Sequence, residues 1–335
     1  MNLKDQKYNR FALCNEMLQA VEVIENFNIA VVNPFVEAVQ QTINMLLTGE
    51  GSSRIFPAKH FRYQLLSKGI EYNVVIEGAT QAMEYQLGDY VVFGVSNSGK
   101  TKELVELFSK LKEKNHPCYY GVTASPGTPV CLLATDSLVL SCGKEEAVAA
   151  TKSVVEQGLF FTGLLHKAFN LDVPSFGELA AQVKAVLELT IDSDIVKLIA
   201  DAPVVYFAGR NNGVAEELAL KTNEITRKKS AFLEGTYALH GIEEVMNGGE
   251  VLVIIDPFEQ EEKKFRDVLV RGVGVEVIAI SSRQTIFPTI QVPDAGLFNN
   301  YVELAAGWNL LVETGISLGT DLDKPVRARK IGNEF

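Results

Sequence analysis

Hydrophobic and polar residues alternate along this chain in two repeating patterns. Short apolar runs of strand length are followed by stretches in which apolar residues return every three or four positions, as on one face of a helix. In the first half these patterns predict strands at residues 44–48, 72–76, 89–95, 118–122 and 136–140, and helices at 53–67, 101–114 and 145–168. Strands that alternate with helices favour a parallel sheet covered on both faces.

Helical periodicity also covers residues 15–43, where Pro34 is expected to separate two helices. After Pro174 a helical stretch leads to Asp201 and forms a bridge, and the alternation of strands and helices then restarts. The second half predicts strands at 203–208, 251–255 and 275–280, and helices at 212–228, 260–272 and 299–313. At 335 residues the chain is long enough for two α/β domains.

The second half repeats the first. The strand, glycine turn and helix that begin at Asn44 resemble those that begin at Val204, and the Glu-Gly pair at 77–78 aligns with the pair at 234–235. In this alignment Met83 corresponds to His240. The functional residues are not repeated, because the counterpart of residues 94–101 is 253–261, whose acids and Pro257 do not suit an anion.

The segment GVSNSGKT at residues 94–101 lies between a predicted strand and a predicted helix. Backbone N–H groups converge in such a turn, and the positive end of the helix favours an anion. The segment fits the P-loop pattern, in which Lys100 would contact phosphates and Thr101 magnesium. It also fits a sugar-phosphate site that uses the hydroxyls of Ser96, Ser98 and Thr101. A tight turn without a ligand is a third interpretation, which the closely spaced serines disfavour.

Composition narrows the class of protein. A formal net charge of -11 argues against a nucleic-acid partner, the first residues lack the apolar core of a signal peptide, and the apolar runs are too short to span a membrane. The histidines are scattered without metal-ligand spacing, and the cysteines lack C-x-x-C spacing and are expected to be buried thiols: Cys14, Cys118, Cys131 and Cys142. We therefore expect a soluble, cytoplasmic protein that uses no metal and no cofactor.

Charged residues in the second half form a candidate catalytic group. Glu217, Lys221 and Glu224 lie at i, i+4 and i+7 of a predicted helix, so they share one face. An exposed stripe with one weak salt bridge is the simpler interpretation. The position of this helix in the repeat, its closeness in sequence to His240 and the anion site of the first half favour proton transfer on a bound sugar instead. Four cations of the final segment form either a solvated run or a cover for an anionic site: Lys324, Arg327, Arg329 and Lys330.

Six short motifs occur in an order that resembles the SIS (sugar isomerase) family, and in particular the isomerase domains of glucosamine-6-phosphate synthases. They are GEGSS at 49–53, SNSGKT at 96–101, EEAVAATK at 145–152, EELALKTNEI at 216–225, YALHG at 237–241 and GTDLDKPVRARK at 319–330. The resemblance implies two SIS subdomains, each a nested α/β sandwich around a five-stranded parallel sheet. We accordingly expect amino-terminal helices at 1–40, a phosphate-binding SIS domain at 41–172, a second SIS domain at 173–320 and a tail over the active site at 321–335.

The resemblance also implies roles for single residues. It implies a homodimer with shared active sites that each bind a phosphorylated sugar. Glu224 would move a proton between C1 and C2, His240 would assist ring opening and Lys330 would form a Schiff base with the ketose carbonyl. The remaining matched residues would bind the substrate: Ser52, Ser53, Ser96, Asn97, Ser98, Thr101, Glu145 and Lys221.

The chain departs from the family pattern in ways that leave the substrate open. We expect no glutamine-dependent amination, because the sequence shows no glutaminase domain and no amino-terminal catalytic cysteine. Asn97, Lys100 and Ile242 replace the usual glutamine, glutamate and proline. The expected activity is therefore an aldose–ketose isomerase or an amino-sugar-phosphate deaminase. The alternatives are a deglycase of fructosamine 6-phosphates, a phosphosugar sensor without catalysis and, least favoured, a P-loop NTPase.

Overall fold

The computed structural model describes residues 1–172 and 174–327. The chain divides into two compact units that interleave in sequence. Among the described residues, the first-sheet unit comprises 22–145, 150–172, 174–176 and 326–327, and the second-sheet unit comprises 1–21, 146–149 and 177–325. Within the described residues, no helix has the length and apolar character needed to cross a membrane.

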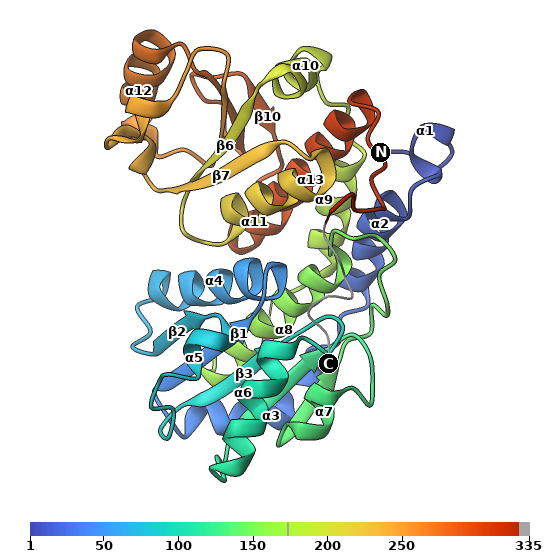
Figure 1. Ribbon diagram of the computed structural model, residues 1–335, viewed down its shortest axis with the longest axis vertical. Coiled ribbons are helices and arrows are strands. Elements are labelled where there is room, and N and C mark those ends of the chain that lie inside the picture. Colours follow the sequence, from blue (N-terminus) through green and yellow to red (C-terminus); the bar gives the residue numbers. More distant parts are fainter. Residues whose placement is uncertain (173, 328–335) are drawn as a thin grey trace. The chain divides into compact units, whose positions relative to one another are not determined.

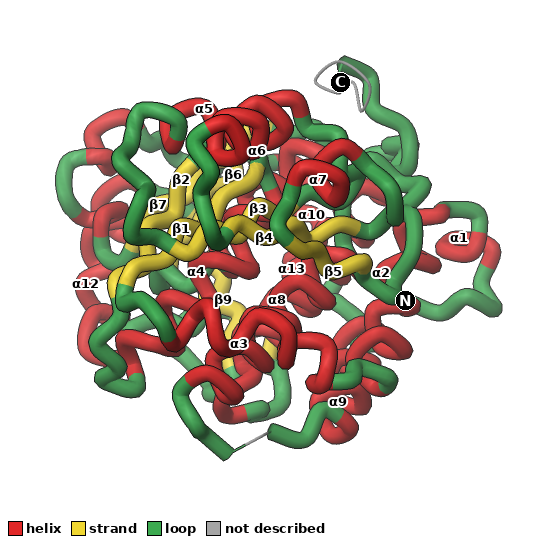
Figure 2. The backbone as a smooth tube through the Cα atoms, turned by 90° about the horizontal axis from the view of Figure 1, so that it is seen from below, coloured by secondary structure: helices red, strands yellow, loops and turns green. Residues whose placement is uncertain are grey.

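The first sheet has five parallel strands in the order β2-β1-β3-β4-β5 (Figures 1 and 2). The strands are β1 (Asn44–Gly49), β2 (Asn73–Glu77), β3 (Val91–Val95), β4 (Tyr119–Thr123) and β5 (Asp136–Val139). Their order confirms the predicted parallel α/β sheet. It also creates a switch point between β1 and β3. The connection after β1 leads to β2 on one side of β1, whereas the connection after β2 leads to β3 on the other side of β1.

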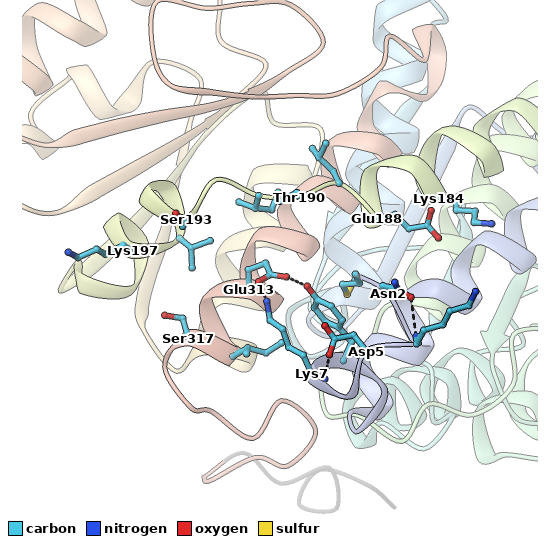
Figure 3. A pocket seen from close by; sticks show the side chains of 17 residues that line it. Asn2, Asp5, Lys7, Lys184, Glu188, Thr190, Ser193, Lys197, Glu313 and Ser317 are labelled. Atoms are coloured by element: carbon cyan, nitrogen blue, oxygen red, sulfur yellow. Dashed lines mark hydrogen bonds and ion pairs between the residues drawn. The ribbon is translucent and has the colours of Figure 1, made fainter.

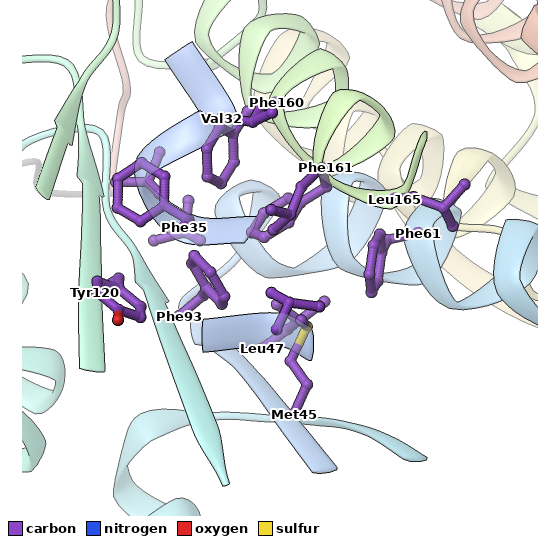
Figure 4. Packing of buried hydrophobic residues seen from close by; sticks show 14 of the residues in the cluster. Val32, Phe35, Met45, Leu47, Phe61, Phe93, Tyr120, Phe160, Phe161 and Leu165 are labelled. Atoms are coloured by element: carbon purple, nitrogen blue, oxygen red, sulfur yellow. The ribbon is translucent and has the colours of Figure 1, made fainter. Parts of the chain in front are cut away.

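Helices cover both faces of the first sheet. On one face, α3 (Asn33–Gln40), α4 (Ser52–Ser67) and α8 (Lys152–Ala168) pack against alternate strand residues. Aromatic rings fill this core: Phe35 meets Phe93 and Phe160 edge-on, with centroids 6.0 and 5.5 Å apart (Figure 4). The helices α5 (Ala79–Ala82), α6 (Lys102–Glu113) and α7 (Pro129–Leu133) cover the opposite face.

Short helices precede this sheet. They are α1 (Gln6–Asn9), α2 (Ala12–Glu25) and the 3-10 turn Ile29–Val32. Pro34 lies in the first turn of α3, where its missing N–H is tolerated, and this confirms that it separates helices.

The second sheet repeats the strand order of the first. Read as β7-β6-β8-β9-β10, all its strands are parallel and each takes the place of its counterpart. The strands are β6 (Val204–Gly209), β7 (Lys229–Glu234), β8 (Val251–Ile255), β9 (Glu276–Ser281) and β10 (Thr289–Gln291). The edge strands β7 and β10 were absent from the sequence-based prediction.

The helices of this second-sheet unit contain more irregular turns than predicted. The segment 260–272 is not one helix but a 3-10 turn (Glu259–Glu261), α12 (Glu262–Phe265) and a π-helix (Arg266–Val273). The predicted helix at 212–228 is α11 (Val214–Lys221), which continues as a π-turn (Thr222–Thr226). The remaining helices are α9 (Gly177–Leu187), α10 (Ser193–Asp201) and α13 (Asn299–Ser317).

A pair of glycines shows how closely the two sheets correspond. Gly49 ends β1 beside Val95, and Gly209 ends β6 beside Ile255. A Cβ atom at Gly49 would lie 2.5 Å from the carbonyl oxygen of Val95, and one at Gly209 would lie 2.7 Å from that of Ile255. Both switch points therefore require a residue without a side chain, which confirms the internal repeat in structural terms.

Candidate functional site

The loop at residues 94–101 joins β3 to α6, and hydrogen bonds of the Ser96 side chain hold its turn together. The Ser96 hydroxyl is buried, accepts the N–H of Gly99 at 3.0 Å and lies 2.8 Å from the Thr101 hydroxyl. The Ser98 hydroxyl accepts the N–H of Lys100 at 3.2 Å. The Lys100 residue itself is exposed. The hydroxyls of Ser96 and Ser98 thus shape the loop, and the side chain of Lys100 makes no hydrogen bond within this described loop.

Gly99 gives this loop its tight path. Its φ is +65°, and a Cβ atom there would lie 2.6 Å from the Cβ of Thr128. Thr128 immediately precedes α7, and Val130 on that helix donates its N–H to the carbonyl of Gly99 at 3.1 Å. Glycine is therefore required twice over, by its backbone conformation and by the close approach of α7.

Glu145 ties the loop to the start of α8. Its carboxylate accepts the Asn97 side-chain amide at 2.9 Å, the N–H of Thr151 at 2.6 Å and the Ser153 hydroxyl. These bonds hold residues 145–151 in an irregular turn, so the predicted helix at 145–168 is wrong at its start and α8 begins at Lys152. A buried carboxylate that accepts these hydrogen bonds is an anchor that orients Asn97.

The predicted substrate-binding residues of the first half gather at one edge of the first sheet. Ser52 and Ser53 begin α4 directly after Gly51, whose φ is +57°. Because β1 and β3 are neighbouring parallel strands, this turn and the 94–101 loop lie at the same carboxyl edge, on the two sides of the switch point. The amino termini of α4 and α6, with 16 and 12 residues, contribute N–H donors and positive dipole ends there.

The charged face of α11 is buried. Lys221 is fully buried, its ammonium lies 3.3 Å from the Glu217 carboxylate and 2.8 Å from that of Glu224, and Glu217 is equally buried. The simpler interpretation, an exposed stripe, is therefore wrong. Burial alone would lower the pKa of Lys221, but the attraction of Glu224 and Glu217 outweighs it and raises that pKa above its ordinary value. Lys221 is held as a cation.

Glu224 lies on a π-turn. Residues Thr222–Thr226 continue α11 with wider turns, and Arg227 ends them in a left-handed conformation with φ +58°. The side chain of Glu224 is 25% exposed, unlike those of its two charged neighbours. The structure therefore presents one partly accessible carboxylate, backed by a buried ammonium. Single π-turns of this kind are frequent at functional sites.

His240 occupies the position that the repeat predicts. It follows the one-turn 3-10 helix Tyr237–Leu239 after β7, as Met83 follows α5 after β2. The residue is exposed, and the next residue, Gly241, has φ +99°. The ion-pair partner that the structure gives Glu224 is Lys221 rather than His240. Lys330, predicted as the Schiff-base lysine, lies outside the described residues.

Charged side chains of the protein itself occupy the switch point of the second sheet, between β6 and β8. Arg210 follows β6 and donates to the Asp256 carboxylate at 2.5 Å, and its guanidinium stacks on Phe258 with 4.4 Å to the ring centroid. Asp256 stands where the first repeat has Ser96. Glu303 on α13 is fully buried nearby, and this burial, together with Asp256 and against Arg210, raises its pKa to about 8. The sequence analysis missed Glu303, although an acid within the apolar run YVELAAGW at 301–308 was a usable signal.

The second-sheet unit also has a cleft of about 1030 Å³ between α1, α10 and α13 (Figure 3). Lys7 and the Tyr8 hydroxyl donate to the two carboxylate oxygens of Glu313, each at 2.5 Å. The described residues that line it include none of the predicted site residues.

In the described residues the potential metal ligands are dispersed and the cysteine thiols are unpaired. Across residues 1–172 and 174–327, no three His, Cys, Asp or Glu side chains are grouped so that they could hold a metal ion. The cysteines are unpaired, but only Cys14 is buried, so the prediction of four buried thiols is wrong for the other three.

Comparison with known proteins identifies the fold. Residues 39–167 match the SIS domain family. Residues 39–167 therefore form a SIS domain. Its second sheet, with the same strand order, has the architecture of a second SIS subdomain. This confirms the predicted α/β fold of two SIS subdomains with five-stranded parallel sheets.

The curated relatives are isomerizing glutamine–fructose-6-phosphate aminotransferases. That of Halobacterium salinarum is 25% identical over 315 residues, which is 86% of this chain and 51% of the relative. That of Streptococcus pyogenes is 25% identical over 274 residues, which is 75% and 45%. The chain thus spans about half the length of the curated relatives it matches.

Solved structures share this fold over nearly the whole chain. The carboxyl-terminal domain of glucosamine-fructose-6-phosphate aminotransferase from Francisella tularensis has a TM-score of 0.77 at 17% identity, covering 94% of this chain and 98% of that one. Tagatose-6-phosphate ketose/aldose isomerase from Escherichia coli has 0.74 at 16%, covering 94% and 96%. Glucosamine-6-phosphate deaminase from Thermotoga maritima has 0.71 at 20%, covering 94% and 98%. At these identities the likeness establishes the fold.

Proposed function

We propose that this SIS protein is an enzyme that moves a proton between C1 and C2 of an amino-sugar or ketose 6-phosphate, with isomerisation or deamination as the outcome. The observation that carries the proposal is the charged group on α11: a partly exposed Glu224 carboxylate held 2.8 Å from the buried Lys221 ammonium. A carboxylate fixed in this way can take a proton from one carbon and return it to the next. The names of the structural relatives support a phosphosugar as substrate.

The substrate phosphate would bind at the switch point of the first sheet. Two helix amino termini and the hydroxyls of Ser52, Ser53, Ser96, Ser98 and Thr101 favour an anion there. Asn97, oriented by Glu145, would contact a sugar hydroxyl. Phosphate binding away from the reacting carbons supplies energy that can be used to orient C1 and C2.

The charge of Lys221 bears on the choice of the Schiff-base lysine. A Schiff base forms from a neutral amine, and the raised pKa of Lys221 keeps this side chain protonated. The role of Lys221 is therefore that of a fixed cation beside the base, and the resemblance to the SIS family points to Lys330 for the Schiff base. His240, exposed on its turn, would assist ring opening in a homodimer with shared active sites. A phosphorylated substrate also suits a cytoplasmic enzyme.

A small substrate panel tests the proposal. The protein is incubated with fructose, glucosamine and fructoselysine 6-phosphates while aldose, ammonia and amino acid release are measured. Glu224→Gln is expected to abolish turnover and leave substrate binding intact, and Glu276→Gln, at an exposed position of the same unit, is the control. Full activity in Glu224→Gln would refute the assigned base.

The same sugar panel, together with an assay of ATP hydrolysis, separates the other candidates. Release of an amino acid from fructoselysine 6-phosphate would identify a deglycase, and tight binding without any turnover would identify a sensor. Magnesium-dependent ATP hydrolysis that is lost in Lys100→Ala would identify an NTPase. The exposure of Lys100 and the bond between the Ser96 and Thr101 hydroxyls disfavour that last outcome.

A further inference from the structure

The stretch of backbone that runs from the end of β4 into α7 holds the phosphate loop, residues 94–101, along one side. Three backbone hydrogen bonds join the two: the N–H of Ser96 donates to the carbonyl of Val122 at 3.0 Å, the N–H of Ala124 to that of Asn97 at 3.1 Å and the N–H of Val130 to that of Gly99 at 3.1 Å. Three residues of the loop are held in this way, so the course of residues 122–130 bears directly on where the loop lies.

One thiol and two hydroxyls fix the shape of this stretch. The Thr128 hydroxyl donates to the sulfur of Cys131 at 3.3 Å. The Thr123 hydroxyl lies 3.3 Å from the same sulfur, and it accepts the S–H of Cys131 because its own proton goes to the carbonyl of Ser125 at 2.8 Å. Both threonines are buried, so water does not compete for these bonds. The three side chains therefore form a continuous chain of hydrogen bonds across the turn between β4 and α7.

Thr128 is the member of this chain that touches the phosphate loop. Its side chain lies against the Cα of Gly99, since a Cβ atom added there would lie 2.6 Å from the Thr128 Cβ and 2.9 Å from its Cγ2, and would meet the hydroxyl oxygen too. Threonine is branched at Cβ, so the bond to Cys131 selects which of its groups faces the glycine. Gly99 in turn donates its N–H to the Ser96 hydroxyl at 3.0 Å, which lies 2.8 Å from that of Thr101. The orientation of Thr128 thus affects the hydroxyls that would bind a phosphate.

We propose that Thr128 is a positioning residue of the phosphate site: its hydroxyl, held by Cys131, sets the position of Gly99 and with it the donors of the loop. This inference rests on the proposed function, in which the substrate phosphate binds at residues 94–101. The phosphate lies away from the reacting carbons, so it contributes equally to the binding of the substrate and of the transition state. A displaced loop therefore raises KM and leaves kcat unchanged.

Replacement of Thr128 by valine tests this role. The variant exchanges the hydroxyl for a methyl group, so it removes the bond to Cys131 and crowds Gly99. We expect KM, and the dissociation constants of the three panel sugars in calorimetry, to rise about 3- to 10-fold while kcat stays within about twofold. Inorganic phosphate, used as a competitor, should lose affinity by the same factor, because it occupies only the loop. Thr128→Ser keeps the hydroxyl and should recover most of the affinity. The control Thr42→Val should match the wild type, because its hydroxyl donates to the carbonyl of Asp89 at 2.7 Å, at the opposite, amino edge of the same sheet.

A second variant acts on the other end of the same bond. Cys131→Ala removes the acceptor and leaves Thr128 in place, so it should weaken sugar binding in the same way, and Cys131→Ser should restore it. The double variant Thr128→Val/Cys131→Ala should lose no more affinity than the weaker-binding single variant, because both changes break one interaction. Thermal unfolding followed by far-UV circular dichroism shows which variants are folded.

Three results would overturn the inference. Folded Thr128→Val and Cys131→Ala proteins that bind sugar and phosphate as the wild type does would overturn it and leave the proposed function standing. A fall in kcat at unchanged KM would do the same, since it would show a role in the fold and not in the phosphate site. Wild-type protein that binds none of the panel sugars would overturn the proposed phosphate site, and the inference with it.

Discussion

Replacement of Lys221 by methionine is the sharpest test of the buried charge cluster. Methionine keeps most of the apolar stem but removes the ammonium that lies 3.3 Å from Glu217 and 2.8 Å from Glu224. Because Lys221 and Glu217 are both fully buried, the variant leaves a carboxylate in the core without its cation. Breaking a buried pair from one side costs about 3–5 kcal/mol, and we expect Lys221→Met to lose this much free energy of unfolding.

The matched control is an ion pair on the protein surface whose residues have the same spacing in sequence as Glu217 and Lys221. Lys102 and Glu106 are also four residues apart on a helix, 3.8 Å from each other, with side chains 56% and 41% exposed. Lys102→Met should therefore cost at most about 0.5 kcal/mol. In the double variant Glu217→Gln/Lys221→Met part of the stability should return, because no buried charge is left unpaired.

Urea denaturation followed by tryptophan emission measures the loss. Trp308 is 1% exposed on α13, which packs against α11, so its emission reports on the unit that contains Lys221. A loss below about 1 kcal/mol for Lys221→Met, or one equal to that of the surface control, would refute the claim that this cation is needed to keep Glu217 buried.

Two further predictions concern the switch points of the two sheets. Gly99→Ala places a Cβ atom 2.6 Å from the Cβ of Thr128 and should weaken phosphosugar binding, as measured by calorimetry. The control Gly127→Ala has a similar φ of +66° but open space around it, and it should leave this binding unchanged. Equal losses of binding in the two variants would mean that backbone strain alone is responsible. Glu303 has a folded-state pKa of about 8 against an ordinary value of 4.5, so the folded state binds the extra proton and stability should fall as the pH rises between these values. Glu303→Gln should remove this slope, by up to about 1.4 kcal/mol per pH unit, and parallel stability curves for wild type and variant between pH 5 and 8 would contradict the assignment.

Local patterns in the sequence were enough to predict most of the helices and strands, but not the edge strands of the second sheet or the start of α8. The central strands of the first sheet, β1, β3 and β4, are apolar runs that are buried along almost their whole length, and such runs are easily detected in a sequence. Edge strand β7 carries Lys229, Ser230 and Glu234 in its six residues, and β10 has only three residues, so neither gives a clear signal. The start of α8 was predicted too early because Glu145 captures the N–H of Thr151, a contact that no propensity reveals.

The candidate site shows the same division. The phosphate loop could be located from its glycines, serines and flanking elements, since all of them are close in sequence. The spacing of Glu217, Lys221 and Glu224 was visible too, but an exposed stripe and a buried cluster have the same i, i+4 pattern. The packing of α13 against α11 decides between them, and those contacts join residues far apart in the sequence.

The π-turn at Thr222–Thr226 also limits how this chain can change its length over evolutionary time. A π-turn holds one residue more than the α-helical turn it replaces, and each α-helical residue advances by roughly 100° about the axis. Loss of a single codon within this stretch would restore regular helical bonding while rotating Arg227 and the strand that follows away from their partners. We therefore expect insertions and deletions here to disrupt the fold, whereas surface loops tolerate them. Lineages that descend from this gene should diverge at this helix by substitution alone.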